Sequence, residues 1–167
     1  MMLSLRFVPT AVLALVVAAC GCSTFSAPTK KSSKAAQERA MKFSPPEGKV
    51  GIYVLRPYQF VAAGLPAPLF LDHATFGQLP PHTFLYCEVL ARDHVLELAE
   101  VPGAKSASLR FKTEAGRCYF FRTRVVLGGF SIKPLSEEEG RKQVRKLELS
   151  GDSVFEAQVA EPNPIAK

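Results

Sequence analysis

The chain contains 167 residues, carries a formal net charge of +6 and has four cysteines. This length supports one domain with a hydrophobic core and excludes two ordinary domains. The positive charge would suit a nucleic acid, but the basic residues form no recognised nucleic-acid motif, so we expect no such partner. Only Cys87 and Cys118 lie beyond the N-terminal region, which excludes a disulfide framework, and their spacing fits no zinc motif.

Residues 1–19 have the layout of a secretory signal peptide. Arg6 supplies a positive charge, an apolar run extends from Phe7 to Ala19, and small residues precede Cys20. The run is too short to cross a bilayer as a helix, which takes about 20 apolar residues, and it has no polar face for a surface helix. Its ending, Val17-Ala18-Ala19-Cys20, resembles the lipobox of bacterial lipoproteins.

The lipobox resemblance implies that Cys20 is lipidated. In those lipoproteins the cysteine receives a diacylglyceryl group, the signal peptide is removed before it, and the new amino terminus is acylated, for example with palmitate. A single acyl chain binds a membrane reversibly, whereas several chains on one residue hold a protein there. Gly21 stands where inner-membrane lipoproteins carry an aspartate, which implies the outer membrane facing the periplasm. A plain signal peptide cut after Ala19 and acylation of Cys22 remain open alternatives.

Residues 20–48 are predicted to form a lipidated flexible tether. They are rich in Ser, Lys, Ala and Pro, and they show no apolar periodicity. Residues 35–41 have helical composition, but the sequence gives them no face to bury. The run Pro45-Pro46-Glu47-Gly48 marks the start of the domain, which we place at residues 49–150. Residues 151–167 are predicted to form a C-terminal strand or a disordered tail.

Residues 49–150 are predicted to fold as short strands separated by Pro and Gly. The predicted strands are 50–55, 67–71, 75–79, 83–90, 94–99, 106–113, 117–126 and 146–149, with 154–159 as a further candidate. One short helix is predicted from the capping box Ser136-Glu137-Glu138-Glu139. This pattern favours an all-β, antiparallel sandwich of the immunoglobulin-like or prealbumin-like kind.

Strands 106–113 and 117–126 are predicted to form a hairpin around Glu114-Ala115-Gly116, because Gly116 suits the left-handed position of a three-residue loop. That register places Phe111 opposite Tyr119 on the buried face. The other face gathers basic side chains and one aromatic ring, and we take it as the candidate binding patch. Its residues are Arg110, Lys112, Phe120, Arg122 and Arg124.

The candidate binding patch would suit an anionic envelope lipid or an acidic envelope protein, and Phe120 could anchor a partner. The alternative is a charged sheet face that keeps the protein soluble and prevents edge-to-edge pairing. Two loops, 60–66 and 127–130, are apolar, and we expect them to close over the core ends rather than to contact a partner.

No catalytic or metal site is expected. No nucleophile lies on a strained elbow, and the three histidines, His73, His82 and His94, are interpreted as surface or capping residues. Asp72-His73 and Asp93-His94 could converge on a metal, but neighbouring strand side chains point to opposite faces. The acidic strand residues, among them Glu88, are interpreted as solvated. A disulfide between Cys87 and Cys118 is disfavoured, since only Cys87 shares a face with apolar neighbours.

Several short segments of the domain follow one another in a distinctive order. They are Tyr53-Val54-Leu55-Arg56-Pro57, Gln59-Phe60, Gly64, Leu71-Asp72, Gly77-Gln78-Leu79, Glu114-Ala115-Gly116-Arg117-Cys118-Tyr119-Phe120 and Glu137-Glu138-Glu139-Gly140-Arg141. In this order they resemble the bacterial "domain of unknown function 2846" lipoproteins. The resemblance extends from about residue 49 to residue 149 and implies an exported β-domain without an established activity.

The sequence therefore predicts a lipid-anchored cell-envelope protein with a non-catalytic binding or structural role and no cofactor. Its expected partners are the membrane, through the acyl chains, and an envelope protein or anionic envelope lipid. The alternatives are an accessory subunit of an envelope transport or secretion complex and a hydrolase whose site the sequence does not reveal.

Overall fold

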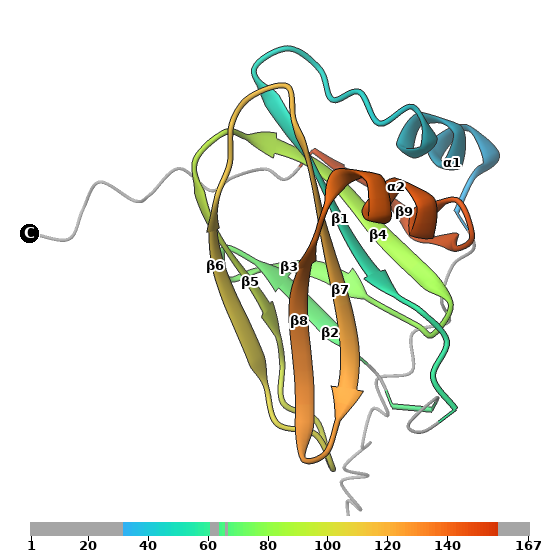
Figure 1. Cartoon of the computed structure of the whole chain (residues 1–167), viewed down its shortest axis with the longest axis vertical. Coiled ribbons are helices and arrows are strands. Elements are labelled where there is room, and N and C mark those ends of the chain that lie inside the picture. Colours follow the sequence, from blue (N-terminus) through green and yellow to red (C-terminus); the bar gives the residue numbers. More distant parts are fainter. Residues whose placement is uncertain (1–31, 61–63, 66, 157–167) are drawn as a thin grey trace, which may run out of the picture.

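The computed structural model describes residues 32–60, 64–65 and 67–156, without the side chains of residues 152–156. The predicted signal peptide, Cys20 and the predicted tail beyond residue 156 lie outside the described residues. In the described part, nine strands form two sheets and two helices lie against one of them (Figure 1).

One sheet has five strands in the order β8-β7-β1-β4-β9, and the other has four in the order β3-β2-β5-β6. The five-stranded sheet contains β1 (Lys49–Arg56), β4 (Thr83–Leu90), β7 (Cys118–Val126), β8 (Gly129–Leu135) and β9 (Glu148–Glu156). The four-stranded sheet contains β2 (Pro68–Leu71), β3 (Ala74–Gln78), β5 (Asp93–Leu98) and β6 (Ala107–Lys112). The predicted all-β sandwich is confirmed; most strand pairs are antiparallel, while β1–β7 and β4–β9 are parallel.

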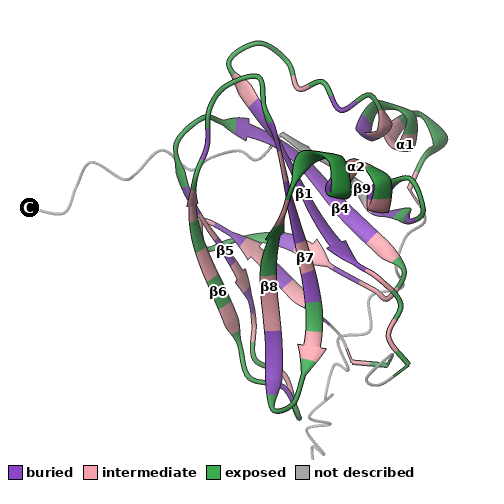
Figure 2. Ribbon diagram, viewed as in Figure 1, coloured by how far each residue is buried: buried purple, intermediate pink, exposed green. Residues whose placement is uncertain are grey.

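The central strands are buried on both faces, as the continuous apolar run of β1 predicts (Figure 2). Ile52 and Val54 point into the core between the two sheets. Tyr53 and Leu55 point to the other face, where a second apolar cluster lies beneath the helices. The five-stranded sheet is therefore the middle layer of the molecule.

Helix α1 (Lys34–Met41) corrects two predictions, that the domain has one helix and that the flexible tether extends to residue 48. Its N-cap Ser33 accepts a hydrogen bond from the backbone N–H of Ala36 at 3.2 Å. The sequence showed no clear apolar face because Ala40 and the following Phe43 are the segment's fully buried apolar residues in the second cluster, with Ala36 and Met41 only partly buried against it. The ring of Phe43 lies 5.5 Å from that of Tyr53, which fixes the segment to the sheet.

Helix α2 (Glu137–Val144) begins as predicted, with Ser136 accepting a hydrogen bond from the N–H of Glu139 at 3.3 Å. Gly140 faces the sheet so closely that a Cβ there would lie 2.1 Å from Cγ of Phe120. Phe120 is consequently 2% exposed, and the prediction that it presents an exposed aromatic anchor is wrong.

The predicted hairpin of residues 106–126 is also wrong. Strand β6 pairs with β5, whereas β7 lies in the other sheet between β1 and β8. Phe111 was predicted opposite Tyr119 in the hairpin; instead it packs across the core between the sheets, with its ring centroid 4.4 Å from that of Phe121 and 6.4 Å from that of Tyr119. The side of each strand that faces the core between the sheets was correctly predicted, but Cys118 and Phe120 on the other side of β7 are buried in the second apolar cluster. The Glu114–Arg117 turn carries the chain from one sheet to the other. Strand β8 was missed because its start was interpreted as an apolar loop.

Candidate functional site

The candidate binding patch is divided between the two sheets. Arg110 and Lys112 are exposed on β6, whereas Arg122 and Arg124 lie on the outer face of β7, beside α2. A continuous basic stripe therefore does not exist, because it depended on a hairpin that does not form. The pair on β7 remains as the basis of a site, since other cationic side chains join it.

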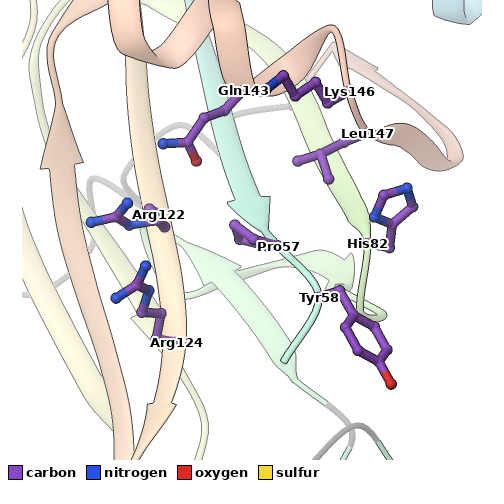
Figure 3. A pocket seen from close by; sticks show the side chains of 8 residues that line it. All are labelled: Pro57, Tyr58, His82, Arg122, Arg124, Gln143, Lys146 and Leu147. Carbon is purple, nitrogen blue, oxygen red and sulfur yellow. The ribbon is translucent and has the colours of Figure 1, made fainter. Parts of the chain in front are cut away.

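Arg122 and Arg124 line an open pocket of about 350 Å³ at the end of the five-stranded sheet. Figure 3 shows the two arginines along β7 on one side, His82 and Tyr58 on the other, and Pro57 between them. Residues in the last turn of α2 and just after it complete the lining, which consists of Pro57, Tyr58, His82, Arg122, Arg124, Gln143, Lys146 and Leu147. We call this the cationic pocket.

Parallel pairing of β1 and β7 explains why these residues meet. Both strands end at the same edge of the sheet, so Pro57 and Tyr58, which follow β1, lie beside Arg124 near the end of β7. His82 precedes β4, whose first residue pairs with Arg56 at the end of β1. No spacing in the sequence links these segments, so Tyr58, His82 and Lys146 were missed as site residues.

The cationic pocket has more positive than negative charge. Nη1 of Arg122 lies 3.6 Å from Oε1 of Glu139, which also accepts a hydrogen bond from Gln143 at 2.8 Å. Nε of Arg122 is buried without a hydrogen-bond partner. Among the described residues, no carboxylate lies within ion-pair distance of Arg124 or Lys146. Two exposed cations therefore stay available for an anionic group.

A second polar cluster surrounds Asp72. Its Oδ2 lies 2.8 Å from Nδ1 of the buried His94 and accepts a hydrogen bond from Arg92, while Oδ1 accepts one from the N–H of Val95. Burial alone would raise the pKa of Asp72, but these hydrogen bonds outweigh it and lower the pKa. Nε2 of His94 lies 3.0 Å from the carbonyl oxygen of Leu90.

The Asp72 cluster is structural. Asp72 from one of the two Asp–His pairs contacts His94 from the other. Since His94 is buried, the prediction that it is a surface or capping residue is wrong. Both ring nitrogens of His94 face protein oxygens, so neither is open to a substrate. In the part of the chain that the structure describes, no group of three or more His, Cys, Asp or Glu side chains could hold a metal ion.

Glu88 is buried, contrary to the prediction that it is solvated. Its carboxylate accepts hydrogen bonds from Nε of Arg39, on α1, at 3.1 Å and from the hydroxyl of Tyr86 at 2.8 Å. The hydroxyl of Tyr53 donates to the carbonyl of Ala40 at 2.8 Å. These contacts attach α1 to the outer face of the sheet, and burial raises the pKa of Tyr53 and Tyr86.

Cys87 and Cys118 are free thiols on opposite faces of the five-stranded sheet. Cys87 faces the core between the sheets, and Cys118 donates to the carbonyl of Phe43 at 3.3 Å. Burial raises the pKa of Cys118 to about 11 and that of Cys87 further. Neither thiol has the exposed, cationic surroundings of a reactive cysteine.

Within the described residues, no helix has the length and apolar character needed to span a membrane. No family model and no solved structure matches the chain, so the "domain of unknown function 2846" resemblance stays a prediction. The chain is 31% identical over 142 residues to an uncharacterised protein of Haemophilus influenzae, and the match covers 83% of this chain and 80% of that protein. At this identity and coverage, the chain belongs to the same protein family as the Haemophilus influenzae protein.

Proposed function

We propose that this protein is a lipid-anchored cell-envelope protein whose sandwich domain binds an anionic ligand and performs no catalysis. The anchoring part of the proposal depends on the lipobox-like segment ending at Cys20. The first helix begins after its N-cap Ser33, so residues 20–32 connect the lipidated cysteine to the domain. A connection of this length spans at most about 45 Å, which keeps the domain close to the membrane surface.

The observation that carries the binding part is the cationic pocket. A volume of about 350 Å³ lies within the range of small-ligand sites, about 300–1,000 Å³. Arg122 and Arg124 offer planar guanidinium groups that suit phosphate or carboxylate oxygens, and Lys146 adds a third cation. Pro57 and Leu147 supply apolar surface beside these charges. The lining contains no buried nucleophile paired with a base, which favours binding over catalysis.

Substituting Cys20 tests the anchor. In cells fed labelled palmitate, we expect Cys20→Ser to lose the label and to retain its signal peptide, which a shift to the larger precursor mass would show. Cys22→Ser, two residues further along, is the matched control and should be processed and labelled normally. A Cys20→Ser protein that is still labelled and still loses its signal peptide would contradict the proposal.

Removing two positive charges from the cationic pocket tests whether it binds an anionic ligand. The acylated protein in neutral detergent is titrated calorimetrically with inorganic phosphate and with monomeric short-chain phosphatidylglycerol, which separates a free phosphate from a lipid headgroup. Loss of two charge-assisted contacts in Arg122→Gln/Arg124→Gln should weaken binding about tenfold or more. The control Arg110→Gln/Lys112→Gln makes the same change of charge on the other sheet. Equal losses in the two variants would show nonspecific attraction and refute the pocket.

A further inference from the structure

Large apolar side chains are exposed mainly at one end of the sandwich. Phe60 is 88% exposed, Leu127 is at 105% of its reference exposure, and Val126 and Tyr58 are also exposed. These residues lie at or just after the ends of the parallel strands β1 and β7, which lie side by side (Figure 1). The sequence prediction that the segments around Phe60 and Leu127 close over the core is therefore wrong for these two side chains.

Two hydrogen bonds hold the two apolar segments together. The N–H of Val125 donates to Oε1 of Gln59 at 2.9 Å, and Nε2 of Gln59 donates to the carbonyl of Val125 at 3.4 Å. Phe60 is thus placed beside the turn that carries Val126 and Leu127. We call these three residues the apolar tip.

Cationic side chains surround the apolar tip. Arg124 precedes it on β7, and the exposed Lys105 donates from its backbone N–H to the carbonyl of Gly128 at 3.1 Å. Lys146 lies in the cationic pocket with Arg124, and Glu100 is the acidic residue that shares a surface hollow with Lys105 and Gly128. Apolar side chains bordered by cations are typical of protein surfaces that enter the headgroup region of a bilayer.

The first turn of α1 lies toward the end of the sandwich that carries the apolar tip. Near the beginning of α1, Gln37 accepts a hydrogen bond from the N–H of Leu149, whose strand partner Phe84 pairs with Leu55 near the end of β1. After α1, Phe43 contacts Cys118, which pairs with Gly51 near the start of β1. Helix α1 therefore runs in the direction opposite to β1, and its first turn lies nearer the apolar tip than its last turn does.

From these observations we propose that the apolar tip rests on the lipid bilayer, with Phe60 and Leu127 inserted among the headgroups. This inference depends on the proposed acylation of Cys20, which would attach the chain to the same bilayer. The domain would then stand on the membrane end-on, with the cationic pocket facing the headgroup region. The opposite end, which carries the exposed Leu90, would face away from the lipid.

The chain contains no tryptophan, so a single introduced indole reports its own surroundings. Phe60→Trp and Leu127→Trp place the probe at the apolar tip, on side chains too exposed to affect folding. Leu90→Trp is the matched control, because Leu90 is 57% exposed and pairs with Lys49 at the other end of β1. Each acylated variant is reconstituted into phosphatidylethanolamine–phosphatidylglycerol vesicles with and without brominated acyl chains.

We expect the emission of Phe60→Trp and Leu127→Trp to shift to shorter wavelength and to be quenched by the brominated lipid. The emission of Leu90→Trp should show neither effect. If all three variants sediment with the vesicles but respond equally, the membrane contact of the tip is refuted while the anchor stands. If none of them sediments, the anchor is refuted, and the inference with it.

Discussion

Replacing Gly140 by alanine tests the packing of α2 on the five-stranded sheet. In an exposed helix interior, alanine makes the helix more stable than glycine does by about 1 kcal/mol, so helix propensity alone predicts a more stable protein. Here the added Cβ would lie 2.1 Å from Cγ and 2.5 Å from Cβ of Phe120. Those atoms are close to the backbone of β7 and cannot move aside as the end of a long side chain would.

The steric cost should exceed the gain in propensity. Overpacking a filled site costs about 1–3 kcal/mol, and a contact this short belongs at the upper end of that range. Subtracting the propensity gain leaves a net loss of about 2 kcal/mol in the free energy of unfolding. With an ordinary dependence on denaturant, the urea midpoint should fall by about 1 M.

Urea unfolding followed by far-UV circular dichroism measures this loss. Glu138→Ala is the control, because Glu138 lies on the exposed side of the same helix and its substitution should change stability by less than about 0.5 kcal/mol. If Gly140→Ala instead raised the free energy of unfolding by about 1 kcal/mol, α2 would not be in close contact with the sheet. The close contact between α2 and Phe120 would then be incorrect.

Three further outcomes follow from the buried polar groups. Arg39→Ala removes two hydrogen bonds from the buried Glu88 and should lower the free energy of unfolding by about 2–3 kcal/mol in urea titrations; no change would mean that α1 is not docked. Because the pKa of Asp72 is lower in the folded than in the unfolded chain, its carboxylate stabilises the fold at any pH above the unfolded pKa of about 3.9. This contribution is lost as the pH falls through the folded pKa. The wild-type urea midpoint should therefore fall more steeply with acid than that of Asp72→Asn, and parallel curves would contradict this. Cys87 and Cys118 should resist alkylation at pH 8 until urea unfolds the chain, as peptide mass spectrometry can establish; labelling in native buffer would show that the thiols are accessible.

Local features of the fold were predictable because they depend on neighbouring residues. The bounds of β4 match the predicted 83–90, and Ser136 caps α2 as its sequence requires. The break between the predicted strands 67–71 and 75–79 is a turn in which Asp72 and His73 adopt positive φ angles of 51° and 65°. Alternation along each strand also identified the side of β6 and β7 that faces the core between the sheets, which does not depend on which strands pair. It did not identify the burial of Cys118 and Phe120 on the other side of β7.

Pairing between strands could not be predicted, because it depends on residues distant in sequence. The Glu114–Arg117 turn has the composition of a hairpin, yet the N–H of Gly116 donates to the carbonyl of Lys49 at 2.8 Å. That contact directs the chain to β1 and away from β6. The candidate site changed for the same reason, since the cationic pocket collects side chains from β7, from α2 and the segment after it, and from two loops.

The strand order also determines when the domain can fold. Gly51 in the central strand pairs with Cys118, and Thr83 pairs with Glu148, so the five-stranded sheet cannot close until nearly the whole chain has been synthesised. Distant pairings of this kind fold slowly compared with local hairpins. The export that we propose for this chain would benefit from this delay, because only an unfolded polypeptide can thread through a narrow translocation channel.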